Sequence, residues 1–177
     1  MLGLVAEAVT GKPLGQLLQE RIFTPLELTS TSFPLTIELA PDFVHAYLRL
    51  SSGSPLIDAA PLLGPSWAWA AGGVVSNAHD VTLFYRALLT GKLLQATQLK
   101  EMETTTPVAG TYGLGISVEL TACGRAYGHA GDFIAWRNVV YSTANGKRQA
   151  VVMVNGDETT VSWPRITADA QLALCRG

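Results

Sequence analysis

Apolar residues recur at helical spacing in the first part of the chain and at strand spacing in its last third. Residues 2–9 predict a helix that ends before Gly11, a residue suited to a helix C-terminus. A second helix is predicted from Pro13, which suits a first helical position. Its apolar stripe is expected to face the core and consists of Leu14, Leu17, Leu18 and Ile22.

A third helix is predicted to run from Asn77 to Leu89, because Asn77 is a good N-cap with Asp80 three residues later. Asp80 is therefore interpreted as a helix-capping residue in preference to a catalytic acid. A fourth, shorter helix is predicted over residues 96–105.

Strand-like segments follow at residues 112–120, 125–128, 133–142 and 148–155. Asn145-Gly146 predicts a hairpin turn between the last two strands. A closing helix is predicted over Trp163–Cys175, with Pro164 near its start. Helices, then an antiparallel sheet, then a packing helix together predict an α+β fold.

Composition agrees with one domain spanning residues 1–177. Apolar residues make up 48% of the chain and charged residues 15%, which favours a buried core over disorder. The net charge of −2 favours neither nucleic acid nor an anionic membrane as a partner. No run is long enough to span a membrane, and Met1–Val9 is too short and contains Glu7, so we do not interpret it as a signal peptide.

Chemistry is suggested by the five residues Tyr127-Gly128-His129-Ala130-Gly131 within the strand-rich part. Glycine in a strand marks a close backbone approach, and Gly131 would let a ligand lie flat against the strand. His129 would project beside that ligand, where an imidazole can hold or move a proton near neutral pH. The competing interpretation is a structural histidine beside a turn.

Several further motifs occur in the order found in one family of serine hydrolases. They are the stretches Leu2–Leu14 and Ile22–Pro34, the run Trp67–Ser76 followed by His79-Asp80, and Tyr112-Gly113-Leu114-Gly115. With Ala122-Cys123-Gly124, the His129 motif and Cys175, the chain resembles class C β-lactamases and serine D-Ala-D-Ala carboxypeptidases. The resemblance covers nearly the whole chain and implies a partial β-lactamase/transpeptidase-like fold.

Two of the three catalytic motifs of that family are absent from this sequence. No serine stands three residues before any lysine, which excludes the Ser-x-x-Lys motif that carries the nucleophile. No tyrosine or serine is followed two positions later by asparagine, which excludes the Tyr-x-Asn motif. We therefore expect the chain to correspond to the C-terminal half of such a protein and to be inactive alone.

The resemblance assigns roles to the third motif. His129 takes the position of a cation or proton shuttle near the leaving group, and the backbone N–H of Asp132 takes that of one oxyanion-hole donor. Ala130 and Gly131 are expected to contact substrate. Trp67 is either an aromatic wall of the acyl pocket or a core residue, and Trp69 is expected in the core.

Three departures from the family pattern weaken recognition of a D-Ala-D-Ala terminus. Ala130 lacks the hydroxyl that usually meets the substrate carboxylate, and the Asp132 carboxylate is expected to repel it. The Ser117-Val118-Glu119 segment lacks the arginine that related carboxypeptidases use. An esterase-like or other acyl substrate is therefore also considered.

The resemblance also implies a disulfide between Cys123 and Cys175, and hence a secreted or periplasmic location. The alternative is that both cysteines are free, buried thiols. His45, His79 and His129 are far apart in the sequence and form no His-x-x-x-His pair, so we expect no metal. No phosphate loop or dinucleotide motif is present, so no cofactor is expected.

Two functional hypotheses remain from the sequence. The first is the C-terminal portion of an acyl-enzyme-forming serine hydrolase that acts on a small-molecule or peptidoglycan-like acyl substrate. The second is a non-catalytic remnant that binds and associates through an exposed face. In either case we expect self-association or pairing with a separate N-terminal half.

Overall fold

A four-stranded antiparallel sheet forms the centre of the computed structural model, which describes residues 1–36, 42–62 and 64–176. The strand order is β3-β4-β5-β6. The bounds are Ser117–Thr121 for β3, Gly124–Phe133 for β4, Trp136–Thr143 for β5 and Gln149–Val154 for β6. This sheet, with helices before and after it, confirms the predicted α+β class.

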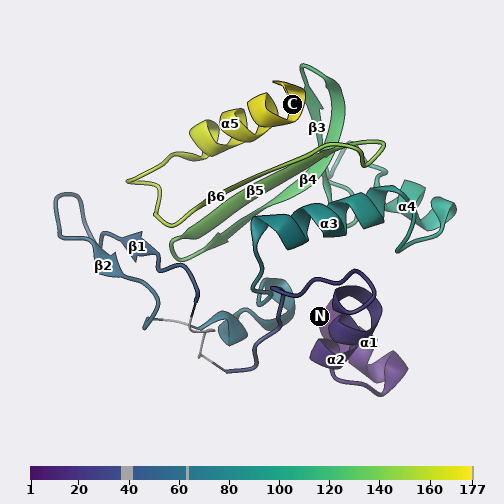
Figure 1. The fold of residues 1–177 in the computed structure, drawn as a ribbon, viewed down its shortest axis with the longest axis horizontal. Coiled ribbons are helices and arrows are strands. Elements are labelled where there is room, and N and C mark those ends of the chain that lie inside the picture. The colour runs from purple at the N-terminus through teal and green to yellow at the C-terminus, as the bar shows by residue number, and fades with distance from the viewer. Residues whose placement is uncertain (37–41, 63, 177) are drawn as a thin grey trace.

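Two helices sandwich the sheet. Figure 1 shows α5 (Trp163–Arg176) on one face and α3 (Ala78–Leu89) on the other. The core beneath α5 consists of Ala126, Val139, Tyr141, Ala150, Ile166, Ala170 and Leu174. The core beneath α3 consists of Tyr85, Leu88, Leu89, Ile116, Tyr127 and Val140. Neighbouring residues of one strand thus face opposite cores, as strand alternation requires.

The N-terminal helices lie below α3 in the view of Figure 1, apart from α5. Helix α1 (Leu2–Thr10) ends at Gly11, whose φ of 69° is left-handed, as the sequence predicts. Pro13 lies just before α2 (Leu14–Leu18), which continues as a π-helical segment, η1 (Gln19–Phe23). Of the predicted apolar stripe, Leu17 is buried, and Leu14, Leu18 and Ile22 are half-buried.

The remaining elements are short. Helix α4 (Ala96–Met102) follows α3. Two 3₁₀ turns, η2 (Pro65–Trp67) and η3 (Trp69–Ala71), precede α3. Strands β1 (Tyr47–Leu48) and β2 (Ile57–Asp58) form a separate two-stranded sheet. The N–H of Tyr47 donates to Asn155 O at 3.0 Å, which joins β1 to the segment after β6.

The start of β3, the end of β4 and the start of β5 differ from the sequence prediction, and β5 begins at Trp136 instead of residue 133. Strand β3 begins at Ser117 because Gly113 and Gly115 turn the chain, and a side chain at Gly113 would lie 2.1 Å from Met102 O. Strand β4 continues through the whole His129 motif to Phe133, because every residue from Ala126 onward has a partner on β5.

The predicted hairpin between β5 and β6 is present. Gly146 has a φ of 63°, and its N–H donates to Thr143 O at 2.8 Å. A glycine suits this left-handed position because it lacks Cβ.

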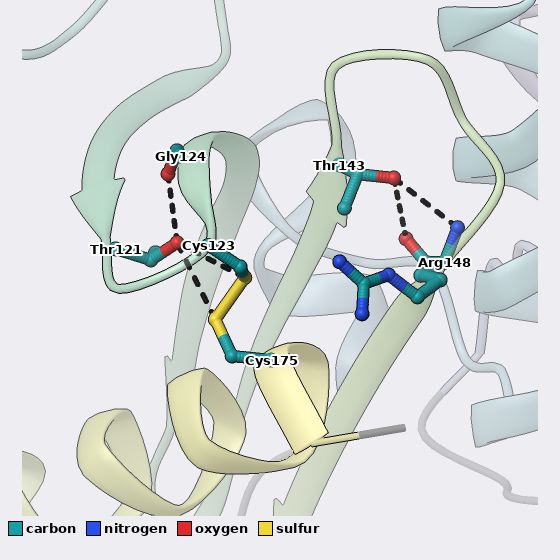
Figure 2. The surroundings of a disulfide bond; sticks show 6 residues. All are labelled: Thr121, Cys123, Gly124, Thr143, Arg148 and Cys175. Carbon is teal, nitrogen blue, oxygen red and sulfur yellow. Dashed lines mark hydrogen bonds between the residues drawn. A yellow bond between two sulfur atoms is a disulfide. The ribbon is translucent and has the colours of Figure 1, made fainter.

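A Cys123–Cys175 disulfide joins the turn between β3 and β4 to the last turn of α5. Figure 2 shows Thr121 beside it, with the Thr121 hydroxyl donating to Gly124 O at 2.7 Å. The hydroxyl oxygen lies 3.4 Å from Cys123 Sγ and 3.6 Å from Cys175 Sγ. The predicted pairing is therefore confirmed, and the alternative of two free thiols is wrong.

Candidate functional site

Strand β4 extends beyond its neighbour β3. The β3–β4 ladder ends where Ser117 pairs with Gly128, whereas the β4–β5 ladder continues to Phe133 and Trp136. Within the part of the chain that the structure describes, residues 129–133 therefore pair with β5 alone. The His129 motif lies on a strand segment with one open edge.

The direction of the backbone groups along this edge follows from the ladder. Val118 donates its N–H to Thr111 O at 2.7 Å, away from β4, so Val118 and its partner Tyr127 form a non-hydrogen-bonded pair. The N–H and C=O groups of Tyr127 then point to β5. Because these directions alternate along a strand, the N–H and C=O groups of Gly128, Ala130 and Asp132 point away from β5, to the side where β3 lies. Beyond the end of β3, the N–H of Asp132 is thus directed at the open edge.

Side chains on this segment alternate between the two faces. His129 is paired across the strands with Val140, which belongs to the core beneath α3. Ala130 is paired with Val139, which belongs to the core beneath α5. His129, Gly131 and Phe133 therefore share the α3 face, whereas Ala130 and Asp132 share the α5 face.

The His129 ring is held at both nitrogens. Nδ1 lies 2.5 Å from Ala130 O, and Nε2 lies 2.7 Å from the Tyr112 hydroxyl. The Tyr112 and His129 rings meet edge to face with centroids 5.6 Å apart. Both side chains are exposed, so the pair is open to a ligand.

Asn138 occupies the space beside Gly131. A side chain at Gly131 would lie 2.7 Å from Asn138 Nδ2, so the glycine is needed for the close approach of this amide. The sequence suggested that the glycine makes room for a ligand. The structure adds a polar amide, on the same face as His129, that fills this room.

The Asp132 carboxylate faces away from His129 and is paired with a buried cation. Arg137 Nε lies 3.4 Å from Asp132 Oδ2, and the Arg137 guanidinium lies 4.1 Å from the centre of the Trp163 ring. Arg137 also donates to Val161 O at 2.5 Å. Strand alternation places this carboxylate on the α5 face beside a positive charge, and its expected repulsion of a substrate carboxylate stays a prediction.

Aromatic side chains adjoin the end of β4. Trp67 is 72% exposed, and its ring lies 6.4 Å from that of Phe133, whose ring lies 6.4 Å from that of Trp136. Trp67 is thus no core residue, and it stands beside a residue of the His129 face. Trp69 is half-buried and borders the N-terminal helices: its ring would contact a side chain placed at Gly3.

Helix α3 contributes a neutral phenol behind Tyr112. Burial raises the pKa of Tyr85, with proximity to Tyr112 as a smaller cause. Tyr85 therefore stays uncharged at physiological pH and belongs to the apolar core on this side of the sheet.

Sequence reasoning missed four residues of this region: Tyr112, Phe133, Arg137 and Asn138. Tyr112 lies in the Tyr112-Gly113-Leu114-Gly115 motif, but this motif contributed only to the resemblance, through its position among the other motifs, and Tyr112 itself was given no role. The other three required the extended register of β4 with β5, which places Asn138 opposite Gly131 and Arg137 opposite Asp132.

The other histidines and Asp80 lie outside this arrangement. His45 pairs with Asp58 of β2 at 2.7 Å, and His79 is exposed in the first turn of α3. Asp80 is buried and accepts hydrogen bonds from the Ser30 N–H and the Thr31 hydroxyl, while its own N–H donates to Asn77 Oδ1. Its role is structural.

Two hollows of the surface do not include His129. One of about 400 Å³ lies at the N-terminal helices and is lined by residues such as Glu7, Leu14 and Trp69. The other, of about 490 Å³, lies between β6 and α5 and is lined by residues such as Val152, Val154 and Ile166.

Similar proteins of known structure include two enzymes named for the cleavage of amides. A D-stereospecific amidohydrolase from a Streptomyces species shares 36% identity, with a TM-score of 0.79 over 90% of this chain and 50% of that one. A D-amino acid amidase from Ochrobactrum anthropi SV3, solved with L-phenylalanine amide, shares 25% identity with a TM-score of 0.80 over 97% of this chain and 53% of that one.

Among curated proteins, one from Escherichia coli O157:H7, named for a proposed D-alanyl-D-alanine carboxypeptidase activity, is 26% identical over 188 residues. That match covers 88% of this chain and 42% of the relative. The chain thus spans about half the length of the relatives it matches. The family whose description is Beta-lactamase matches residues 1–174, and the chain belongs to this family.

Proposed function

We propose that this chain supplies one wall of a serine acyl-transfer site whose nucleophile lies outside these 177 residues. The observation that carries the proposal is the open edge of β4, where the N–H of Asp132 points outward and His129 stands on the adjoining face. In the complete site, serine would attack an amide or ester carbonyl and form an acyl-enzyme that water then hydrolyses.

Each residue has a role in this proposal. The Asp132 N–H donates one hydrogen bond to the developing oxyanion. In such sites a donor of this kind lowers the free energy of the transition state by about 3–4 kcal/mol. His129 holds a proton near the leaving group. Gly131 leaves space for the Asn138 amide on the face that His129 shares, and Trp67 with Phe133 forms an apolar wall.

The substrate class that fits best is an amide or ester of a D-amino acid without a free terminal carboxylate. Strand β3 carries Glu119 and no basic residue that could bind a carboxylate. The amidase relatives support this choice, since an amide substrate does not need carboxylate recognition. The exposed Trp67 ring suits an apolar side chain.

A titration of the isotope-labelled chain with D-phenylalanine amide tests the binding part of this proposal. We expect amide shifts that cluster at residues 129–133 and at the Trp67 indole, with weaker shifts for L-phenylalanine amide. The Trp67→Ala variant should weaken the response. The matched control is Leu120→Ala, because Leu120 is 83% exposed and lies at the far end of β3, next to the disulfide-bearing turn. Shifts confined to the hollow at the N-terminal helices would refute the assignment.

The disulfide supports an oxidising compartment, which is typical of extracellular or periplasmic proteins. Among the residues that the structure describes, no helix is both long and apolar enough to cross a membrane. We propose a secreted or periplasmic protein, to be tested by fractionation of the cells that produce it.

A further inference from the structure

The hydrogen bonds of His129 determine which ring nitrogen carries the proton. A backbone carbonyl can only accept, so the 2.5 Å contact with Ala130 O requires a hydrogen on Nδ1. In the neutral ring, Nε2 then has no hydrogen and accepts. The partner of Nε2 is the Tyr112 hydroxyl at 2.7 Å, which must therefore donate.

We infer that Tyr112 is a positioning residue of the site, which holds His129 in the Nδ1–H tautomer with Nε2 as the nitrogen that exchanges a proton. The inference rests on the proposed function for its catalytic meaning, but its geometry does not depend on substrate. The opposite tautomer, with the hydrogen on Nε2, would lose the bond to Ala130 O.

The environment of the pair supports a dedicated contact. Tyr112 lies just before β3, where an isolated bridge joins it to Ser117, and His129 lies on β4 just past the end of β3. The hydroxyl thus reaches across the point where the β3–β4 ladder ends. The edge-to-face contact of the two rings fixes the imidazole plane as well as its position.

Holding this tautomer has a chemical consequence. Because Nδ1 carries the hydrogen that bonds to the backbone, Nε2 is the nitrogen that can take up a further proton. The Tyr112 hydroxyl is its hydrogen-bond partner. Loss of the hydroxyl would leave the ring free to reorient and to populate both tautomers, because one of its two anchors is gone.

The test uses long-range proton–nitrogen spectra of the ¹⁵N-labelled, ligand-free chain, which distinguish protonated from unprotonated ring nitrogens. A His129→Gln variant identifies the signals of His129 among the three histidines. In the wild-type chain with a neutral ring, we expect a protonated Nδ1 and an Nε2 signal shifted upfield by an accepted hydrogen bond.

In the Tyr112→Phe variant, the Nε2–H tautomer should gain population, which moves the averaged Nδ1 signal downfield and brings the two ring-nitrogen signals closer together. The matched control is Tyr47→Phe, because Tyr47 is 40% exposed and Tyr112 is 41% exposed, and this change should leave the His129 signals in place. A backbone amide spectrum that changes only near Tyr112 and His129 would show that the variant is folded.

A wild-type ring that carries its hydrogen on Nε2 would overturn the inference without any substitution. Ring-nitrogen signals that are identical in wild type and Tyr112→Phe would overturn it as well. Because these spectra require neither substrate nor nucleophile, a failure here is distinct from a failure of the D-phenylalanine amide titration.

Discussion

Single buried polar side chains hold distant segments of this chain together, and Asp80 is the clearest case. Its carboxylate is 1% exposed and accepts the Ser30 N–H at 2.9 Å and the Thr31 hydroxyl at 2.7 Å. These bonds tie the start of α3 to the connector that follows α2, about fifty positions earlier in the chain.

We expect Asp80→Ala to lower the free energy of unfolding by about 2–3 kcal/mol, because two donors lose a charged acceptor inside the fold. Urea unfolding of the two proteins measures this difference. Asn77→Ala is the matched control, since it removes only the helix cap and should cost about 1 kcal/mol. Equal losses in the two variants would show that the carboxylate contributes no more than the cap.

At the same scale, the sequence predicted the identity of the candidate site better than its geometry. His129 and Gly131 were proposed from a local motif whose glycines flank a titratable ring, and Asp132 from the resemblance to the family. Tyr112 and Asn138 were missed because their proximity depends on strand register, which one motif does not encode.

Whole elements were predicted well where the periodicity is long and a turn residue marks the end. Gly11 ends α1, Asn77 caps α3 and Gly146 turns the β5–β6 hairpin. The extent of β4 was underestimated, because Gly128 and Gly131 have low strand propensity. Pairing with β5 overrides that propensity, and a side chain at Gly128 would lie 1.8 Å from Val140 O.

The disulfide anchors α5 to the sheet at the element scale. Its cysteines are 52 positions apart, so reduction should lower the free energy of unfolding by up to about 4 kcal/mol, through the larger entropy of the unfolded chain. Urea unfolding with and without reductant gives the difference. In the control, with both cysteines changed to serine, reductant should have no effect. An effect of similar size in that variant would exclude the disulfide as its source.

Acid should loosen the contact between β1 and the segment after β6. The Thr159 side chain and the Arg49 N–H donate to the Asp157 carboxylate and hold its pKa below the ordinary range. Folding lowers the pKa of Asp157. The contribution of its carboxylate to the free energy of unfolding is therefore fully present above the ordinary carboxyl pKa, and it is lost as pH falls through the pKa of the folded state.

The stability difference between wild type and Asp157→Ala should therefore be constant above about pH 5 and should shrink in stronger acid. Thermal unfolding across this range measures it. Asp42→Asn, which removes an exposed carboxylate, serves as the control. A difference that grows with acidity would contradict the assigned sign.

For the whole molecule, the absence of Ser-x-x-Lys predicts that the chain alone does not form an acyl-enzyme. Incubation with a labelled penicillin or a D-amino-acid ester, read by intact mass, should show unmodified protein. A stoichiometric covalent adduct on any serine would prove the prediction wrong.

The molecule also exposes surfaces that favour association. Strand β6 is an edge strand among the described residues, Met153 on it is 43% exposed, and the hollow of about 490 Å³ beside α5 is lined in part by valines. Open edges and apolar patches recruit other chains. We expect the chain to self-associate through β6, or to pair there with a separate N-terminal half.

Light scattering across a dilution series should show a mass above that of the monomer, which falls on dilution. Met153→Lys places a charge on the edge strand and should shift the chain toward monomer. A wild-type chain that stays monomeric at every concentration would show that this surface is covered by the chain itself.

The Cys123–Cys175 bond also makes a covalent ring of everything between the two cysteines, which includes β4, β5, β6 and all but the end of α5. A protease that cuts the β5–β6 turn, whose tip at Asn145 is exposed, would open this ring without dividing the molecule in two. The nicked protein would migrate as one species until reductant is added. The strand that carries His129 can thus stay covalently attached to the rest of the chain after the backbone is cut in the neighbouring turn.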